Sequence, residues 1–117
     1  MLMVQMLADA YDCDDAIADA EILIGSGRAA VEAVGATVIG ETTTRYVPHG
    51  LTIGLFLAES HLVLTTWPEH RLLLIDVLLC NPEMSPDAVV DVLAARLCPR
   101  GRVVRHRVLR RIAADPA

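Results

Sequence analysis

The chain has 117 residues, 54% of them hydrophobic, and a formal net charge of -5. This length is usual for one domain, so we expect a single domain over residues 1–117, and the apolar excess indicates subunit contact because a small monomer has little interior. No apolar run approaches the roughly 20 residues that span a bilayer, and the N-terminus lacks the basic flank of a signal peptide. We therefore expect a cytoplasmic protein with no membrane segment.

The charges are unevenly divided between the two halves of the chain. Residues 1–60 hold nine acids and two arginines, whereas residues 61–117 hold six acids and eight arginines, six of them between positions 100 and 111. Valine and leucine alternate with these arginines and no aromatic residue accompanies them, which favours a strand with a solvated face over a nucleic-acid groove. We expect no nucleic-acid partner, and we expect the basic cluster to face the acidic residues 9–21 of this or a neighbouring chain.

The cysteines and the absence of lysine limit the chemistry of the chain. Cys13, Cys80 and Cys98 are widely spaced and form no paired motif, so the sequence predicts reduced thiols and neither a disulfide framework nor a metal site. Each thiol, taken alone, is typical of a small buried apolar group. Pyridoxal phosphate needs a lysine amine for its internal Schiff base, so this chain excludes that cofactor.

Alternating and helical patterns predict eight main elements. In chain order we expect a strand, a helix, four strands, a second helix and a last strand, over residues 2–11, 16–34, 37–46, 51–57, 62–66, 72–79, 85–97 and 102–109. The run at 72–79 is nearly all apolar and is predicted to be central, whereas the residues after 109 are expected to form a short mobile tail. Strands in runs, with two helices between them, indicate an α+β fold in which two main helices pack on one face of an antiparallel β-sheet.

The ends of both helices carry recognisable signals. Asp14 or Asp15 is the expected N-cap of the first helix, and Gly35 is a suitable C-terminal cap. Gly25 and Gly27 each weaken that helix by about 1 kcal/mol relative to alanine, so one kinked helix and two short ones both stay open. At the second helix, Ser85 precedes a proline and an acid, which is a strong start signal.

Polar residues interrupt two apolar strands at Glu59, Ser60 and His61. A tight turn with a serine that satisfies local backbone is the simplest explanation of this triplet. In the same way Cys80, which ends the apolar run at 72–79, is explained by a buried thiol at the end of a strand. The residue types alone do not assign a function to either position.

Six blocks of the sequence resemble the prokaryotic S-adenosylmethionine decarboxylases. They occur in the family's order and at similar spacing, and ESH, TWPE and DVxxC are the most specific parts of the match. The blocks are LADAYDC at 7–13, GAT at 35–37, YVPHG at 46–50, AESH at 58–61, TWPE at 66–69 and IDVLLC at 75–80. The resemblance covers essentially the whole chain. It implies the family's fold and a carboxy-lyase that supplies the aminopropyl donor for spermidine and other polyamines.

The resemblance also implies a zymogen that cleaves itself between Glu59 and Ser60 into chains 1–59 and 60–117. The Ser60 hydroxyl would attack the preceding carbonyl, and β-elimination and hydrolysis would leave a pyruvoyl group derived from Ser60. That ketone forms the Schiff base with the substrate amine, which agrees with the missing lysine. By the same similarity Cys80 is the proton donor to the decarboxylated carbon.

Substrate-binding residues follow from the same resemblance. Tyr46 would stack on adenine, and Glu69 would hold the ribose hydroxyls through its two acceptor oxygens. Trp67 either lines the site or fixes the end of its strand. Members of the family pair as homodimers or dimers of dimers with the site near the subunit interface, which suits the apolar excess of this chain.

The departures from the family pattern lie around the processing site. The pattern ESHxxIHTWPE has a histidine that assists elimination where this chain has Thr65, and a hydroxyl is too weak a base near neutral pH. Either His61, His49 or His70 substitutes for it, or processing is slow or absent. A second processing position, usually a serine, is Thr52 here, which is a milder change because the hydroxyl is kept; Thr44 and Asn81 stand where the family has a histidine and a glycine.

Three functions stay open at this point. The first is a pyruvoyl-dependent decarboxylase of S-adenosylmethionine, and the second is one that acts on ornithine or arginine. Tyr46 and Glu69 favour the first, because those amino acids have no adenosine to hold. The third is an unprocessed, inactive homologue that regulates an active paralogue or binds the nucleoside, and Thr65 favours this reading.

Overall fold

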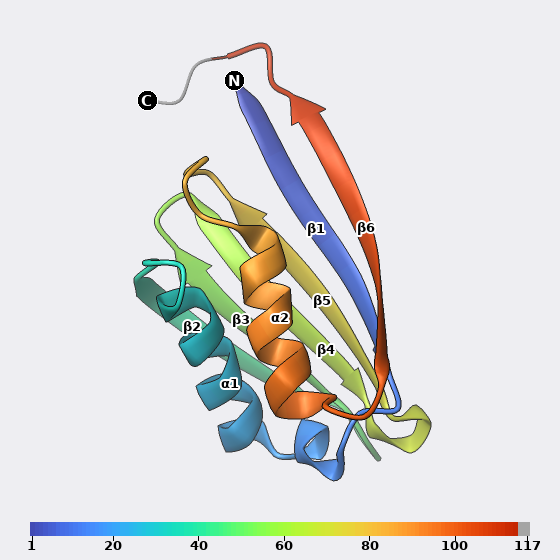
Figure 1. The fold of residues 1–117 in the computed structure, drawn as a ribbon. Coiled ribbons are helices and arrows are strands. Elements are labelled where there is room, and N and C mark those ends of the chain that lie inside the picture. Colours follow the sequence, from blue (N-terminus) through green and yellow to red (C-terminus); the bar gives the residue numbers. More distant parts are fainter. Residues whose placement is uncertain (115–117) are drawn as a thin grey trace.

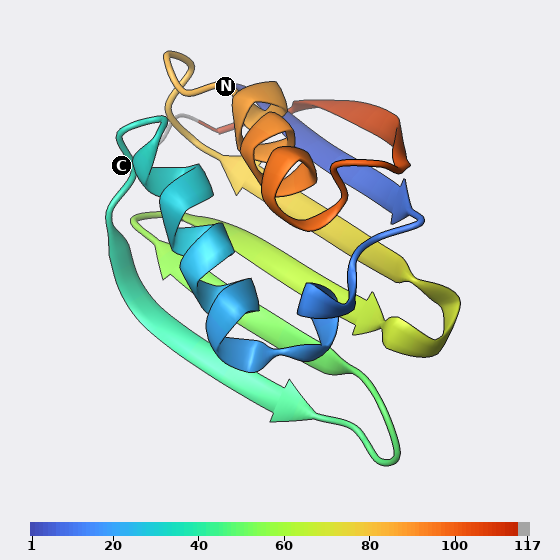
Figure 2. The same ribbon diagram turned by 60° about the horizontal axis from the view of Figure 1, so that its bottom comes forward.

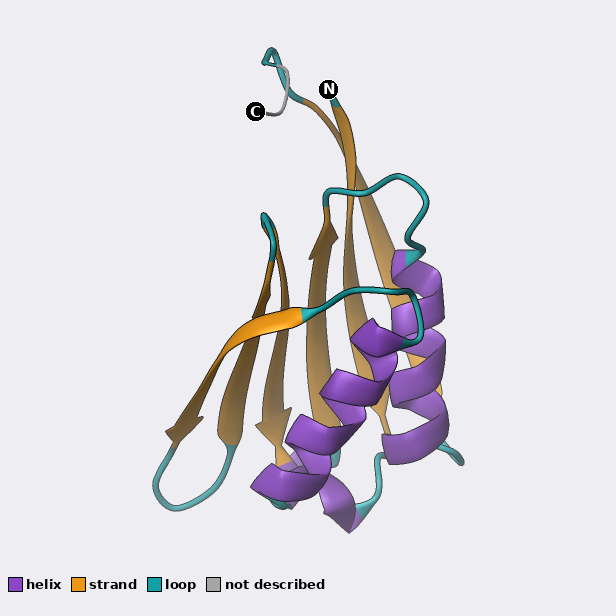
Figure 3. Cartoon of the chain, turned by 90° about the vertical axis from the view of Figure 1, so that its left-hand side faces the viewer, coloured by secondary structure: helices purple, strands orange, loops and turns teal. Residues whose placement is uncertain are grey.

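The structure, a computed structural model, describes residues 1–114. One antiparallel sheet of six strands, in the order β2-β3-β4-β5-β1-β6, carries both α-helices on the same face (Figures 1 and 3). The elements are β1 (Leu2–Tyr11), the 3-10 turn η1 (Asp15–Ala18), α1 (Ala20–Glu32), β2 (Val38–Arg45), β3 (Leu51–Leu57), β4 (Ser60–Trp67), the 3-10 turn η2 (Pro68–His70), β5 (Leu72–Leu79), α2 (Pro86–Leu97) and β6 (Arg102–Arg111). The predicted α+β fold is confirmed, and β5 is central as its apolar sequence indicates.

The start of α1 differs from the prediction. Neither Asp14 nor Asp15 caps the α-helix, because residues 15–18 form the separate turn η1. Asp19 is the N-cap, and its carboxylate accepts the backbone N–H of Ile22 at 3.1 Å. Three nearby aspartates have equal capping preference. The extra turn buries Ile17 in the core, which moves the start of the helix to the third of them.

The two glycines of α1 do not interrupt it. Gly25 and Gly27 lie inside one continuous helix, which settles the choice left open by the sequence. A Cβ at residue 27 would lie 3.0 Å from the Leu55 side chain, so glycine lets α1 approach the sheet closely at this point. Gly35 has a positive φ of 87°, as expected for the residue that ends a helix. The second helix starts as predicted, with the Ser85 hydroxyl accepting the Ala88 N–H.

The hydrophobic core lies between the two helices and one face of the sheet (Figure 2). Alternate residues of β1 show the pattern: Met6, Ala8 and Ala10 are buried under α2, whereas Leu7 and Asp9 point to the opposite side. That opposite side, called the open face below, is not covered by either helix (Figure 3). No helix in residues 1–114 is long and apolar enough to cross a membrane.

The open face of the sheet retains large exposed apolar side chains. They belong to β1, β3, β4 and β6 and are Leu7, Phe56, Trp67, Val104 and Val108. Polar groups lie among them, notably Gln5, Asp9, His61, Asp76 and His106. A sheet face of this composition is typical of a surface that another protein layer covers.

The basic cluster at the C-terminus pairs mainly with α2. Arg105 donates to both Asp87 and Asp91, and Arg107 donates to Asp87. The acidic residues 9–21 of the same chain form no ion pair with these arginines within residues 1–114, although β6 runs beside β1 and Arg102 lies 4.2 Å from the centre of the Tyr11 ring. The alternative, that the arginines face these residues of a neighbouring chain, stays a prediction. The strand also continues to Arg111, beyond the predicted end, and residues 115–117 of the expected tail lie outside the described part of the chain.

Asp87→Asn should lower the free energy of unfolding by about 1 kcal/mol or less, because the lost ion pairs are partly exposed. Hydrogen bonds from Arg107 and then Arg105 lower the pKa of the Asp87 carboxyl. A lowered pKa in the folded state stabilises the protein above the ordinary carboxyl pKa, and this stabilisation is lost as the pH falls through the folded-state value. Urea unfolding at pH 7 and below pH 3 should show a difference between the two proteins only at pH 7. An equal difference at both pH values would contradict the ion-pair explanation.

Candidate active site

The turn between β3 and β4 positions the first candidate residues. Leu57 pairs with Ser60, so Ala58 and Glu59 alone make the turn, and Ser60 and His61 already belong to β4. Glu59 has a φ of 57°, in the left-handed region that non-glycine residues rarely adopt. The predicted polar triplet is thus one strained turn residue followed by two strand residues.

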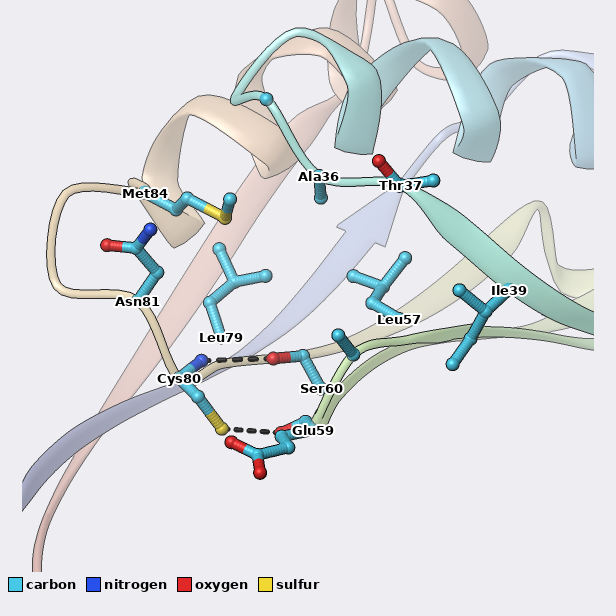
Figure 4. A pocket seen from close by; sticks show the side chains of 12 residues that line it. Ala36, Thr37, Ile39, Leu57, Glu59, Ser60, Leu79, Cys80, Asn81 and Met84 are labelled. Carbon is cyan, nitrogen blue, oxygen red and sulfur yellow. Dashed lines mark hydrogen bonds between the residues drawn. The ribbon is translucent and has the colours of Figure 1, made fainter. Parts of the chain in front are cut away.

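Ser60 and Cys80 meet at this end of the sheet because β4 and β5 are neighbours (Figure 4). The Cys80 backbone N–H donates to Ser60 Oγ at 3.0 Å. The Cys80 thiol donates to the carbonyl oxygen of Glu59. Cys80 therefore contacts both residues that flank the peptide bond between positions 59 and 60.

A cavity of about 390 Å³ opens beside this bond. It is lined by Gly35, Ala36, Thr37, Ile39, Leu57, Ala58, Glu59, Ser60, Leu79, Cys80, Asn81 and Met84. Most of these residues are apolar; Glu59, Ser60 and Cys80 lie together on one side of the cavity, and Thr37 lies away from them (Figure 4). Asn81 begins the turn toward α2, where its side-chain oxygen accepts the Glu83 N–H at 2.9 Å.

The other two cysteines differ from Cys80 in burial. Cys13 and Cys98 are buried, and their thiols donate to the carbonyls of Ala10 and Tyr11 at the end of β1. Burial, together with the neighbouring Cys98 thiol, raises the pKa of Cys13 to about 12. A thiol that stays protonated in the core is unreactive. Cys80, in contrast, is half-buried and lines the cavity.

A second group of candidate residues lies at the opposite end of β4. There a cavity of about 410 Å³ is lined by Tyr46, His49, Thr52, Thr65, Thr66, Trp67 and Glu69. Tyr46 Oη and Thr52 Oγ1 are 2.8 Å apart, and Thr52 Oγ1 is 3.1 Å from Thr65 Oγ1, so three hydroxyls form a hydrogen-bonded chain. Below we call these seven residues the hydroxyl cavity.

Three of the four departures from the family pattern are neighbours in space. Thr44 of β2 pairs with Thr52 of β3, and Thr52 pairs with Thr65 of β4. Cross-strand partners on one face of a sheet lie about 5 Å apart. The three threonines therefore form a continuous row on the open face of the sheet, and their substitutions affect one place in the molecule.

The two groups of candidate residues are separate within one chain. Thr65 follows Ser60 by five positions along β4, a distance of about 17 Å at the rise of an extended strand. An odd spacing also places the two side chains on opposite faces. The resemblance names both residues for one site, but a single chain does not bring them together.

The histidines that could replace the missing one have different surroundings. His61 Nε2 lies 3.5 Å from Asp76 Oδ1, which also accepts the Gln5 side-chain amide at 2.9 Å. His70 belongs to η2 and lines neither cavity. Gln5 and Asp76 were not among the predicted site residues, although an aspartate inside the apolar run 72–79 was a signal. His49 lines the hydroxyl cavity together with Thr65.

Metal ligation has no candidate cluster in residues 1–114. No three histidine, cysteine, aspartate or glutamate side chains gather as ligands would within this part of the chain.

Comparison with known proteins identifies the family. The sequence profile described as S-adenosylmethionine decarboxylase matches residues 4–111. An S-adenosylmethionine decarboxylase proenzyme of Symbiobacterium thermophilum is 44% identical over 77 residues, which are 66% of this chain and 57% of that protein. The Thermotoga maritima proenzyme is 34% identical over 104 residues, or 86% of this chain and 79% of that protein.

A solved structure agrees with these sequence matches. The crystal structure of the adenosylmethionine decarboxylase from Aquifex aeolicus superposes with a TM-score of 0.84 at 30% identity, covering 99% of this chain and 96% of that one. The chain therefore belongs to the S-adenosylmethionine decarboxylase family, whose members are pyruvoyl-dependent carboxy-lyases made as proenzymes.

Proposed function

We propose that this chain is an S-adenosylmethionine decarboxylase that cleaves itself between Glu59 and Ser60 and derives its pyruvoyl group from Ser60. The observation that carries this proposal is that Cys80 contacts both residues of this bond, donating its backbone N–H to Ser60 Oγ and its thiol to the Glu59 carbonyl oxygen. By the similarity described above, the product supplies aminopropyl groups for polyamine synthesis.

The geometry supports cleavage at this bond. Ser60 Oγ attacks the Glu59 carbonyl carbon, the C–N bond breaks, and an ester to Oγ and a free amine result. The left-handed backbone of Glu59 costs on the order of 1–2 kcal/mol, and cleavage relieves this strain. The Cys80 thiol, which donates to the Glu59 oxygen, stabilises the negative charge that develops there.

The surroundings of Ser60 fit a pyruvoyl group at that position. Residue 60 is the first of β4, so the strand holds a new chain end in place. A pyruvoyl ketone condenses with the substrate's amine and accepts the electron pair released with CO2. Cys80 Sγ holds a proton beside residue 60 and delivers it to the decarboxylated carbon.

Recognition of the substrate is assigned to the hydroxyl cavity. Tyr46 offers an aromatic face to adenine, and Glu69 offers two oxygens to the ribose hydroxyls. Trp67 lines the same cavity and is 38% exposed, which supports a role in the site. A small amino acid such as ornithine would leave this cavity unfilled, so the geometry favours S-adenosylmethionine as substrate.

A homodimer unites the two groups of residues. We propose that the open faces of two chains pack together, which covers exposed side chains such as Phe56 and Trp67. A two-fold axis parallel to the sheets and perpendicular to the strands places the Ser60 end of one chain against the hydroxyl cavity of the other. Each site then takes its reactive bond from one subunit and its recognition residues from the second.

The intact mass of the purified protein under denaturing conditions tests self-cleavage. We expect two chains of 59 and 58 residues, the second blocked at its N-terminus, and release of CO2 from S-adenosylmethionine but not from ornithine or arginine. A single species of 12.7 kDa without activity would contradict the proposal. It would favour the regulatory homologue instead, which the replacement of the processing histidine by Thr65 makes the second candidate.

A further inference from the structure

Self-cleavage at Ser60 requires a base that this chain lacks at the expected position. After the ester forms, the Cα proton of residue 60 must be removed so that the Cβ–O bond can break. The side chain at position 65 is a threonine, and its hydroxyl is hydrogen-bonded to Thr52. Hydroxyls do not accept a proton near neutral pH, whereas an imidazole does.

Two of the four histidines already have acidic partners at some distance from the hydroxyl cavity. His61 lies beside Asp76, and His106 Nε2 lies 3.1 Å from Asp9 Oδ2. Only His49 among the histidines of the described chain lines the cavity that Thr65 lines. Its imidazole therefore lies in the region from which a histidine at position 65 would act.

The turn that carries His49 is tightly attached to the strand that carries Thr65. The Tyr46 N–H donates to the Gly50 carbonyl at 3.0 Å and closes the turn. The Leu51 N–H donates to Thr66 Oγ1 at 3.1 Å. Gly50 has a φ of 103°, and a Cβ there would lie 2.8 Å from the Thr66 carbonyl oxygen, so the turn lies directly against β4. This attachment keeps the turn of His49 at the cavity that Thr65 also lines.

We propose that His49 is the base of the elimination step, replacing the histidine that Thr65 displaces. The inference rests on the proposed self-cleavage and on the two-chain site. An imidazole nitrogen of His49 takes the Cα proton of residue 60 of the second chain. The C–H electron pair forms the Cα=Cβ bond, the Cβ–O bond breaks, and Glu59 leaves as a carboxylate. Water then hydrolyses the resulting enamine and releases ammonia, which leaves the ketone.

The substitutions in the hydroxyl cavity agree with this role. Threonine is smaller than histidine, so Thr65 leaves space in the cavity that an imidazole from the neighbouring turn can use. The hydroxyl chain of Tyr46, Thr52 and Thr65 fixes the wall of that space. The change at position 65 and the histidine at position 49 are thus two parts of one arrangement.

The test compares His49→Gln with the wild-type chain by intact mass over time. A general base contributes about a hundredfold or more, so we expect cleavage to slow by about that factor. The earlier acyl shift does not need this base, so the ester should accumulate. Hydroxylamine, which cleaves esters and not peptide bonds under mild conditions, should then release residues 60–117 with an N-terminal serine rather than a pyruvoyl group. Introducing Thr65→His into the His49→Gln chain should restore cleavage.

His70→Gln is the matched control, because His70 lies in the next turn and lines neither cavity. It should cleave at the wild-type rate. If His49→Gln also cleaves at the wild-type rate, or if His61→Gln is the variant that accumulates ester, the assignment of His49 is wrong while the proposed function stands. A wild-type chain that never cleaves would instead overturn the proposed function, and this inference with it.

Discussion

Ser60→Ala should abolish both self-cleavage and decarboxylation. The variant lacks the hydroxyl that attacks the Glu59 carbonyl in the proposed reaction, and without it neither the ester nor the ketone can form. Denaturing mass spectrometry should show one intact chain after any incubation time, and no CO2 should be released from S-adenosylmethionine. Because Ser60 Oγ accepts only one hydrogen bond, from the Cys80 backbone, we expect the folded structure to persist in circular dichroism.

The same variant tests the two-chain site. A Ser60→Ala chain keeps Glu69 intact, whereas a Glu69→Gln chain keeps Ser60 and should cleave itself but bind substrate weakly. In a mixed dimer one of the two sites combines Ser60 with Glu69. Co-expression of the two inactive variants should therefore recover activity, up to half that of the wild-type dimer. If the mixture stays inactive although mixed dimers form, the proposed sharing of residues between subunits is wrong.

The sequence predicts the fold well where side-chain periodicity is strong. The bounds of β1, β3 and β5 agree with the predicted strands. In these segments the alternating or continuous apolar pattern follows directly from which side chains are buried, so the pattern alone marks where each strand begins and ends. The sequence predicts the fold poorly where several local signals have similar strength. Asp14, Asp15 and Asp19 are equivalent caps by composition, and only the packing of Ile17 beneath the helices selects the third.

The candidate site shows a different limit. The contact between Ser60 and Cys80 depends on the adjacency of β4 and β5, which the residue pattern does not predict; the resemblance assigned both residues to one site without giving the strand order. The separation of Ser60 from Thr65 could have been predicted from the sequence, because an odd spacing along a strand places two side chains on opposite faces. Long-range pairings such as that of Arg105 with Asp87 depend on the order of the strands in the sheet, and no local sequence signal predicts that order.

Cys80→Ala should slow two different steps. Loss of the thiol removes a donor from the Glu59 carbonyl, so self-cleavage should slow by about tenfold to a hundredfold, less than for a strong oxyanion donor because a thiol is a weak one. Loss of the proton source should slow decarboxylation by the fully cleaved enzyme by about a hundredfold or more. Cleavage is measured by intact mass, and turnover is measured per cleaved chain, so the two effects are separated.

Cys80→Ser separates the two roles further. A serine hydroxyl still donates to the Glu59 carbonyl, so cleavage should stay close to the wild-type rate. A hydroxyl is, however, a far weaker acid than a thiol, so turnover should remain as low as in the alanine variant. Cys98→Ala, which changes a buried thiol away from the Glu59–Ser60 bond, is the control and should leave turnover per cleaved chain unchanged. If Cys80→Ser recovers turnover together with cleavage, the thiol acts only by holding the Glu59 carbonyl, and another group must supply the proton to the decarboxylated carbon.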